Sequence, residues 1–584
     1  MSGRANHILA SSIAFLSLWP GVSVAIDGRV VDLNGRPLQQ AMVTVAKEAG
    51  QAGPTAVTVF TDDSGRFRFP SDAHGGAPSV RALGYRMIDV GVDSRSQATG
   101  VTILMRADSN QAGIAPASAW LGRISDPNDR VQLVMTCVAC HQMPAPEVRT
   151  FARMIRDVPG ADEESARQQS WHAIVQYMNY LSAWEFGRGA GGGAPDPARV
   201  YSGGDADPTT VLLARSMTGS FQELAGYSRG APLAVDARTV IREYEIPRPN
   251  AVREAVTLAD PGTIWAADVS ANRVIRVDAT TGAQRDYPIP SERLMGPHTL
   301  VRGRDGSLWV APFFNGIVAR LDPATEQWKT WQLSTGSGGP VGVHDLTFDA
   351  HQDLMTDRRG RIWFSDIVNN AVGWLDPASG RSGIYPVPAV PGRTGRELLY
   401  GIVMTSDRRH VWYSQLGIGC FGSFNTETLE FETVVQLPDG NSGPRRVAVS
   451  DRDILYVPLY GSGQLVEYDT RARKMIGVYD LPDRASAPYA TTWDPKRKVV
   501  WIPTSNADAI YRFDPRNRSF AVLPLPREGA FLRMLEVDRQ TGSLVTSYAN
   551  ILENVHGPRM VVKIDVADSG GAEPRTAAAE AGLP

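Results

Sequence analysis

Hydrophobic and polar positions change their period twice along the chain, and these changes divide it into three regions. Between residues 26 and 107 apolar and polar residues alternate, with turn residues such as Asn34 and Gly35 between the runs. From Asp126 to about residue 187 apolar residues recur at steps of three and four, and from residue 239 to residue 568 alternation returns. A period of two predicts strands and a period near 3.6 predicts helices. We therefore expect a small β domain, a short helical segment and a long β region.

The long β region consists of seven copies of one pattern, with a period of ~40 to 55 residues that is typical of a propeller. The second strand of each copy opens with an apolar or aromatic pair, and these pairs begin at residues 264, 308, 362, 411, 455, 500 and 544. Tryptophans at such positions usually pack between blades. We therefore expect them to form the core and not a ligand platform.

The seventh copy ends at Lys563-Ile564-Asp565, without the fourth strand that completes the other copies. The segment 243–247, which precedes the first copy, carries the fourth-strand pattern. We expect this segment to pair with the last copy, because closing the ring removes the exposed strand edges of an open one.

The first β region shows the order G-x-V-x-D-x-x-G-x-P-L from Gly28, A-x-V-x-V from Ala41 and T-D-x-x-G-x-F-x-F from Thr61. This order resembles the carboxypeptidase regulatory-like, transthyretin-like domain, which implies a β-sandwich that serves as a spacer or docking unit. The fold class expected for the chain is mainly β: a seven-bladed β-propeller preceded by a small transthyretin-like β-sandwich and a short α-helical segment. The expected boundaries are 1–25 for a signal peptide, 26–107 for the sandwich, 115–187 for the helical segment, 188–238 for a Gly-rich linker and connector, 239–568 for the propeller and 569–584 for a disordered tail.

The helical segment contains Cys137-Val138-Ala139-Cys140-His141, a CxxCH motif whose thiols can fasten a haem c and whose imidazole can ligate its iron. A disulfide or half of a zinc site is the alternative. The only other cysteine is Cys420, which we expect to be a buried apolar residue, and no histidine spacing completes a zinc site. The motif therefore favours haem.

Short helices around this motif resemble a truncated class I cytochrome c domain. The resemblance implies that His141 is the proximal ligand of the haem iron. Met154 and Met178 are both candidates for the sixth ligand, with His172 behind them, and thioether ligation would raise the reduction potential. A five-coordinate iron is the remaining alternative.

In the propeller region the segments 296–300, 305–309 and 315–320 recur around the ring and resemble the virginiamycin B lyase (streptogramin lyase) family. The resemblance implies metal-dependent opening of a lactone ester by elimination, with histidines at the starts of inner strands in adjacent blades. His298 matches the first of these histidines, and His344 stands at the corresponding place in the next copy. Gly342 stands where the family pattern has a glutamate.

Aligning the inner strands on the aromatic of the following strand places one residue from each copy at the central opening. These residues are Glu254, His298, His344, Tyr400, Arg446, Tyr489 and Arg533. The first three come from consecutive copies, so Glu254 would join the histidines at one metal, with Mg²⁺ as the candidate ion, or would act as a general base. The alternative is that these positions are polar only because they face water.

The amino terminus combines Arg4, an apolar run from Ile8 to Trp19 and a small-residue site ending at Ala25, which predicts a cleaved secretory signal. The run is shorter than the ~20 residues that span a bilayer. The mature protein is therefore expected to be periplasmic or secreted, with no membrane span. The 584 residues carry a formal charge of -3, so no bulk field attracts nucleic acid.

Three classes of function are compatible with these motifs. The first is an exported c-type haem protein whose propeller binds a small-molecule substrate or a redox partner protein while the haem transfers electrons. The second is a metal-dependent lyase or hydrolase at Glu254, His298 and His344, and the third is a non-enzymatic recognition scaffold. The CxxCH motif is the most specific of these signals, so the first class is our hypothesis.

Overall fold

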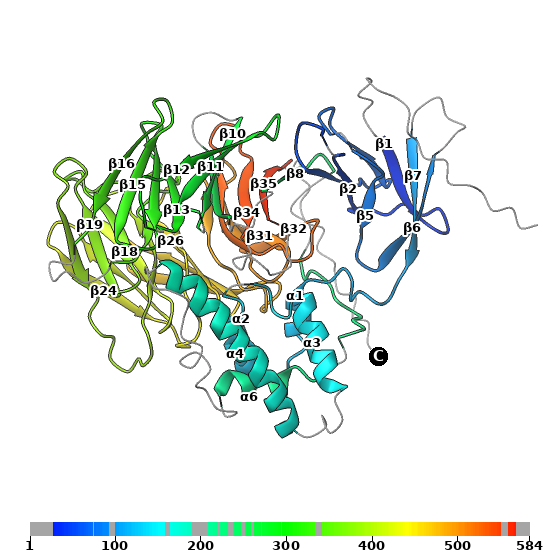
Figure 1. Cartoon of the computed structure of the whole chain (residues 1–584), viewed down its shortest axis with the longest axis horizontal. Coiled ribbons are helices and arrows are strands. Elements are labelled where there is room, and N and C mark those ends of the chain that lie inside the picture. The colour runs from blue at the N-terminus through cyan, green and yellow to red at the C-terminus, as the bar shows by residue number, and fades with distance from the viewer. Residues whose placement is uncertain are drawn as a thin grey trace, which may run out of the picture.

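The computed structural model in Figure 1 describes residues 27–567 with gaps. The gaps are 49, 74, 93–99, 140, 158–163, 190–206, 220, 232–236, 247–251, 258–261, 270, 294, 335–340 and 550–558. The expected signal peptide and carboxyl-terminal tail lie outside the described residues.

Two sheets form the amino-terminal domain. One has the order β4 (Arg66–Arg68), β1 (Asp27–Asp32), β7 (Gly100–Ala107) and β6 (Tyr85–Val92), and the other contains β5 (Ser79–Arg81), β2 (Met42–Ala46) and β3 (Ala56–Phe60). Their facing sides bury a core that includes Val30, Val43, Val59, Phe67 and Ile103. This arrangement confirms the N-terminal β domain, because alternating apolar residues point to one face of each strand.

The repeats fold into antiparallel sheets of four consecutive strands, of which the described residues contain six. The first three are β9 (Val252–Thr257), β10 (Thr263–Asp268), β11 (Arg273–Asp278) and β12 (Gln284–Pro288); β13 (Pro297–Arg302), β14 (Leu308–Pro312), β15 (Ile317–Asp322) and β16 (Gln327–Gln332); and β17 (Val343–Leu346), β18 (Ile362–Asp366), β19 (Ala371–Leu375) and β20 (Ser382–Pro386). The next three are β21 (Leu399–Met404), β22 (His410–Gln415), β23 (Cys420–Asn425) and β24 (Glu430–Gln436); β25 (Ala448–Val449), β26 (Ile454–Leu459), β27 (Gln464–Asp469) and β28 (Lys474–Asp480); and β29 (Thr492–Asp494), β30 (Val499–Pro503), β31 (Ala509–Asp514) and β32 (Ser519–Pro524).

The ring closes through β8 (Val240–Glu245), as the sequence predicts. β8 pairs antiparallel with β35 (Met560–Asp565), which continues β33 (Leu532–Val537) and β34 (Leu544–Tyr548). The other edge of β8 pairs with β3 of the amino-terminal domain, from Ala56 opposite Glu243 to Val59 opposite Val240. The sequence analysis did not foresee this second pairing. It joins the small β domain and the propeller in one seven-stranded sheet (Figure 1).

The tryptophans of the second strands are buried, which confirms their expected role in the core. Trp265, Trp363, Trp412 and Trp501 are at most 3 % exposed. The indole Nε1 of Trp363 donates to Asp357 at 2.9 Å, so this buried polar atom is satisfied. Cys420 is also fully buried, against Val390 and Ile418, as expected.

Helices occupy the segment before the propeller. They are α1 (Ala117–Leu121), α2 (Pro127–Cys137), α3 (Pro146–Arg156), α4 (Glu164–Gly189) and α6 (Pro208–Ser216). α2 begins where Asp126 caps the backbone N–H of Asn128 at 2.8 Å and Pro127 takes the first helical position. α6 lies in the region expected to be a connector, and Leu212 and Leu213 on it are buried. None of the described helices is long and apolar enough to cross a bilayer.

The helical segment shares its hydrophobic core with the propeller. Leu133 and Val134 of α2 and Trp171 of α4 belong to the same buried cluster as Tyr460 and Phe531 of the propeller. Figure 1 shows the helices gathered against one side of the ring. The helical segment is therefore packed directly against the propeller.

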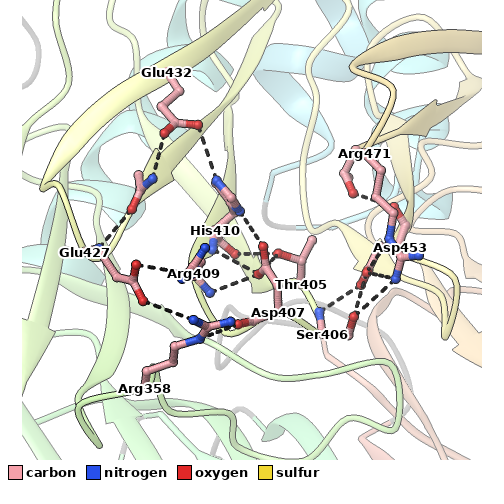
Figure 2. A network of polar contacts seen from close by, with 12 residues as sticks. Arg358, Thr405, Ser406, Asp407, Arg409, His410, Glu427, Glu432, Asp453 and Arg471 are labelled. Atoms are coloured by element: carbon pink, nitrogen blue, oxygen red, sulfur yellow. Dashed lines mark hydrogen bonds and ion pairs between the residues drawn. The ribbon is translucent and has the colours of Figure 1, made fainter.

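A polar network ties three neighbouring sheets together at the turn between β21 and β22 (Figure 2). The His410 imidazole lies between two carboxylates, with Nδ1 2.6 Å from Asp407 and Nε2 3.3 Å from Glu432. Ser406 donates to Asp453 of the next sheet at 2.6 Å, and Arg358 of the preceding sheet pairs with Glu427. The hydrogen bond to Asp407 raises the pKa of His410 above its usual 6.5.

The His410 ion pairs should stabilise the fold only while the imidazole is protonated. A raised pKa in the folded state means that this stabilisation is complete below the unfolded value of 6.5 and is lost as the pH rises through the folded pKa. His410→Gln should therefore lower the melting temperature more at about pH 6 than at about pH 9. The free energy of unfolding should fall by at most about 1 kcal/mol, because the pair is half-exposed. Thermal unfolding followed by circular dichroism measures this difference. His351→Gln, at an exposed histidine, is the control, and an equal loss at both pH values would contradict the assignment.

Candidate functional site

A cavity of about 550 Å³ lies between the helical segment and the end of the propeller where inner strands begin. The helical side contributes Met135, Cys137, Ala139, His141, Met143, Trp171 and Met178 among others. The propeller side contributes His298, Phe313, His344, Tyr400, Arg445 and Arg533 among others. The two groups of candidate residues, which the sequence analysis treated as separate sites, therefore face one space.

Cys137 and His141 both line the cavity. Cys137 is the last residue of α2. His141 stands four residues later in the chain and is 8 % exposed. The Nδ1 of His141 lies 2.6 Å from the Gln142 carbonyl oxygen, which can only accept a hydrogen bond. This contact places the ring proton on Nδ1 and leaves the lone pair on Nε2, as metal-ligating histidines require. Cys140 lies outside the described residues.

Burial lowers the pKa of His141 below its ordinary value, because the charged imidazolium is poorly solvated there. The hydrogen bond to Gln142 acts in the opposite direction but does not outweigh burial. His141 is therefore neutral near pH 7, which is the state that can bind a metal.

The propeller holds the CxxCH loop by its backbone. The Tyr460 hydroxyl donates to the Val138 carbonyl at 2.7 Å, and Nη2 of Arg533 donates to the Ala139 carbonyl at 2.6 Å. Backbone carbonyls in a buried loop need donors, and here the donors come from two different sheets of the ring. The loop therefore has a fixed position over the propeller.

The residues after the motif are held equally firmly. The side chain of Asn506 accepts from the Met143 N–H at 2.8 Å and donates to the Met143 carbonyl at 2.9 Å. The Gln142 amide donates to the buried carboxylate of Asp508 at 2.8 Å. We call the contacts of Tyr460, Arg533, Asn506 and Asp508 with this loop the propeller clamp.

The structure separates the candidates for the sixth haem ligand. Met178 of α4 lines the cavity, whereas Met154 of α3 is 62 % exposed and does not line it. His172 is not a lining residue either, and its Nε2 is hydrogen bonded to Gln176. Met154 was a candidate because it lies on an apolar helical pattern, but that pattern does not tell which side of the helix faces the cavity. Met143, which the sequence analysis missed, also lines the cavity.

On the propeller side, register shifts mark the starts of several inner strands. The pairing is irregular between Pro297 and Thr299 in β13, between Val343 and Leu346 in β17, and between Leu399 and Ile402 in β21. Such bulges bend a strand and redirect its side chains. His298, His344 and Tyr400 lie within these bulges, so the irregularity turns them toward the ring opening.

These three residues form a continuous stack. The ring centroids of His298 and His344 are 4.5 Å apart, and those of His344 and Tyr400 are 3.9 Å apart. The hydroxyls of Tyr400 and Tyr489 are hydrogen bonded to each other. Burial lowers the pKa of His344 to about 4, so this imidazole is neutral at physiological pH. Most of the predicted ring of residues is thus brought together, but the side chain of Glu254 lies outside the described residues.

Arg446 connects three polar groups of the site. Its Nη2 lies 2.7 Å from a carboxylate oxygen of Asp345, 2.6 Å from Thr299 Oγ1 and 3.1 Å from His298 Nδ1. Burial alone would raise the pKa of Asp345, but Arg446 holds it below its ordinary value. The sequence analysis found Arg446 but missed Asp345, which directly follows His344.

His298, His344 and Asp345 form a cluster whose possible ligand atoms all lie within 4.8 Å of one another. The donor set does not fit Mg²⁺, which prefers oxygen ligands in octahedral geometry. It offers two imidazoles and one carboxylate, and that carboxylate is already neutralised by Arg446.

Tyrosines and arginines complete the propeller side of the cavity. The guanidinium carbon of Arg445 lies 3.8 Å from the ring centroid of Tyr460 and 4.2 Å from that of Tyr489. Burial by itself would raise the pKa of Tyr489, but Arg533, Arg445 and Arg446 lower it overall. Aligning the repeats selects a single residue from each copy. This procedure therefore selected Arg446 and missed its neighbour Arg445.

Buried ion pairs connect the propeller sheets at the opposite end of β13. Arg302, near the end of β13, pairs with Asp353 at 2.8 Å and with Glu536 of β33 at 2.7 Å. All three side chains are at most 7 % exposed. These buried pairs link inner strands of separate sheets, so the cavity belongs to the end of the ring that faces the helices.

Comparison with known proteins supports the two β resemblances. The sequence model of the Virginiamycin B lyase family matches residues 233–468, and that of the carboxypeptidase regulatory-like domain matches residues 25–106. The chain therefore contains a virginiamycin B lyase-like propeller and a carboxypeptidase regulatory-like domain. No curated protein matches the chain.

Solved structures of lyases resemble part of the chain. A streptogramin B lyase is 18 % identical over 56 % of this chain and 98 % of its own, with a TM-score of 0.47. Selenomethionine-substituted virginiamycin B lyase from Staphylococcus aureus is 16 % identical over 56 % of this chain and all of its own, with a TM-score of 0.46. A catalytically inactive form of that lyase with Quinupristin covers the same shares at 16 % identity and a TM-score of 0.47.

The propeller clamp predicts a stability effect at Asn506. Asn506→Ala removes two hydrogen bonds to Met143 and one to the Ala485 carbonyl, and it leaves their buried partners unsatisfied. We expect the free energy of unfolding to fall by about 2–4 kcal/mol and the amide of Met143 to exchange faster with solvent. Denaturant unfolding and hydrogen exchange measure these effects. Asn517→Ala, in an exposed turn, is the control, and unchanged exchange at Met143 would contradict the clamp.

Proposed function

We propose that this chain is an exported c-type haem protein that transfers electrons to or from a substrate or redox partner bound at its seven-bladed propeller. One observation carries the proposal: a single cavity is lined both by Cys137 and His141 and by the stack of His298, His344 and Tyr400. A ligand bound at the propeller mouth would therefore touch the haem pocket directly.

The residues of the cavity fit a haem. Its volume of about 550 Å³ lies within the range of ordinary cofactor pockets, and most of its walls are apolar. His141 has its proton on Nδ1 and would offer Nε2 to the iron, while Cys137 and Cys140 would form the thioether links. Haem, when bound, supplies one-electron redox chemistry.

The protein's own residues would do the remaining work. The propeller clamp holds the CxxCH loop in one place, so the distance between the haem pocket and the propeller mouth stays fixed. The apolar helical wall, with Trp171 and Val175, excludes water from the pocket. Low solvent exposure is one of the factors that sets the reduction potential of a haem.

Export fits this assignment, because haem c is attached outside the cytoplasm. The predicted signal sequence ending at Ala25 would deliver the chain to the periplasm or beyond. This predicted signal precedes the described residues, which begin at Asp27.

A second candidate function is a metal-dependent lyase or hydrolase at the propeller mouth. It is favoured by the close approach of His298, His344 and Asp345. We place it second, because the Asp345 carboxylate already has a counter-charge in Arg446.

Covalent haem is tested on protein expressed with a cytochrome c maturation system. The reduced-minus-oxidised spectrum should show a c-type haem, and the mass should exceed that of the bare polypeptide by one haem. Cys137→Ser combined with Cys140→Ser should abolish both signals, because both thioether links are lost. Cys420→Ala, at a buried cysteine remote from the motif, should keep them. Colourless wild-type protein with the bare mass would end the proposal.

The position of Met178 predicts the axial ligand. Met178→Ala should lower the reduction potential and change the visible spectrum of the oxidised haem, because thioether ligation raises the potential. Met154→Ala, at an exposed methionine of α3, is the matched control and should leave both unchanged. Redox titration followed by absorbance measures the potential. Identical behaviour of the two variants would exclude Met178 as a ligand.

A further inference from the structure

We propose that Arg445 and Arg533 form a binding site for the carboxylate of an apolar ligand, at the propeller wall of the cavity. Both side chains line the cavity, and both residues are nearly buried, with 6 % and 5 % of their surfaces exposed. The site depends on these two guanidinium groups and not on the proposed haem, because the carboxylate of another molecule could bind them equally well.

The two arginines have unsatisfied donors inside the protein. Nε and Nη1 of Arg445 and Nε of Arg533 are buried without a hydrogen-bond partner among the described residues. No described carboxylate forms an ion pair with either guanidinium. A buried charge without a counter-charge is strongly unfavourable, so this arrangement calls for an anion.

Other buried arginines of the ring do have a carboxylate. Arg302 pairs with Asp353 and Glu536, Arg361 pairs with Asp357, and Arg446 pairs with Asp345. Arg445 and Arg533 differ from them in facing the cavity. Within the described part of the ring, a buried arginine without a counter-charge is thus found at the cavity wall.

Tyrosine rings hold the two guanidinium groups in place without neutralising them. Arg445 lies between Tyr460 and Tyr489 and also approaches Tyr400, at 5.0 Å from its ring centroid. Arg533 lies 5.0 Å from the ring centroid of Tyr489. Cation–π contacts orient a guanidinium and leave its edge donors available for a planar carboxylate.

The rest of the lining selects the body of the ligand. A third cation, Arg396, lines the cavity, and none of the described lining residues is acidic. Phe313, Phe314, Leu398 and Leu416 make the neighbouring wall apolar. A molecule with a hydrophobic body and a carboxylate therefore matches the cavity in both charge and polarity.

Two carboxylates have this chemistry: a propionate of the haem and a free apolar carboxylic acid. Nη2 of Arg533 also holds the Ala139 carbonyl within the CxxCH motif, so the anion would lie beside the haem pocket in either case. The two sources differ in whether a free acid still binds when haem is present.

The first arm of the test uses octanoate as the probe and octanamide as its neutral match, with isothermal titration calorimetry on the full-length haem-free Cys137→Ser/Cys140→Ser protein. Octanoate should bind and octanamide should bind more weakly. Arg445→Met should raise the octanoate dissociation constant about 10- to 100-fold, because charge-assisted hydrogen bonds are lost. Arg445→Lys keeps the positive charge but loses the paired donors of the guanidinium. Its octanoate dissociation constant should lie between those of the wild type and Arg445→Met. Arg358→Met, at an exposed arginine, should change nothing.

The second arm repeats these measurements on the haem-loaded protein. If the carboxylate is that of a free acid, octanoate binds with haem present and Arg445→Met again weakens it. If it is a haem propionate, octanoate binds only the haem-free protein, and Arg445→Met lowers the reduction potential because a cation beside the haem is removed.

A structural role of Arg445 makes a different prediction. Without any ligand, Arg445→Met should leave the melting temperature unchanged or raise it, because it removes an uncompensated buried charge. A clear fall in the melting temperature, with octanoate and octanamide bound equally in the haem-free protein, would overturn the proposal. If the protein never carries haem, selective octanoate binding that depends on Arg445 supports this site while the haem assignment fails.

Discussion

The architecture around the cavity depends on the hydrogen bonds between the CxxCH loop and the propeller. Backbone carbonyls at Val138, Ala139 and Met143 lie away from bulk water and need donors, and Tyr460, Arg533 and Asn506 supply them. Tyr460 follows β26, Asn506 lies between β30 and β31, and Arg533 belongs to β33, so the donors come together only when three consecutive sheets pack side by side. The cavity is therefore a product of both parts and exists in neither alone.

Ring closure in turn depends on a strand from outside the repeats. β8 completes the last sheet and also carries the amino-terminal sheet on its other edge. One strand thereby protects two edges that would otherwise be exposed. At the far end of the opening, Arg302 with Asp353 and Glu536 joins the inner strands by buried ion pairs. At the end toward the helices, Arg445 and Arg533 have no carboxylate partner among the residues that the structure describes. This difference between the two ends places the candidate binding site in the cavity.

The sequence predicted the candidate site well where one residue per repeat was enough. Aligning the copies selected His298, His344, Tyr400, Tyr489 and Arg533, whose side chains do converge. It missed Asp345 and Arg445, each adjacent in sequence to a selected residue. Regular strands send neighbouring side chains to opposite faces, but the irregular pairing between Val343 and Leu346 breaks this alternation at Asp345. A pattern of period two therefore cannot find both members of such a pair.

The residues alone were enough to predict the strand and helix periods, the repeat and the strand that closes the ring. These depend on interactions between residues close in the chain or on a repeated pattern, so they can be read from the residues. The folded chain was needed to show that Met178 faces the cavity while Met154 faces solvent, that β3 pairs with β8, and that Cys137 and His298 line the same cavity. Such contacts join residues far apart in the chain. Their specificity comes from packing and hydrogen bonding in the folded state, which no local pattern encodes.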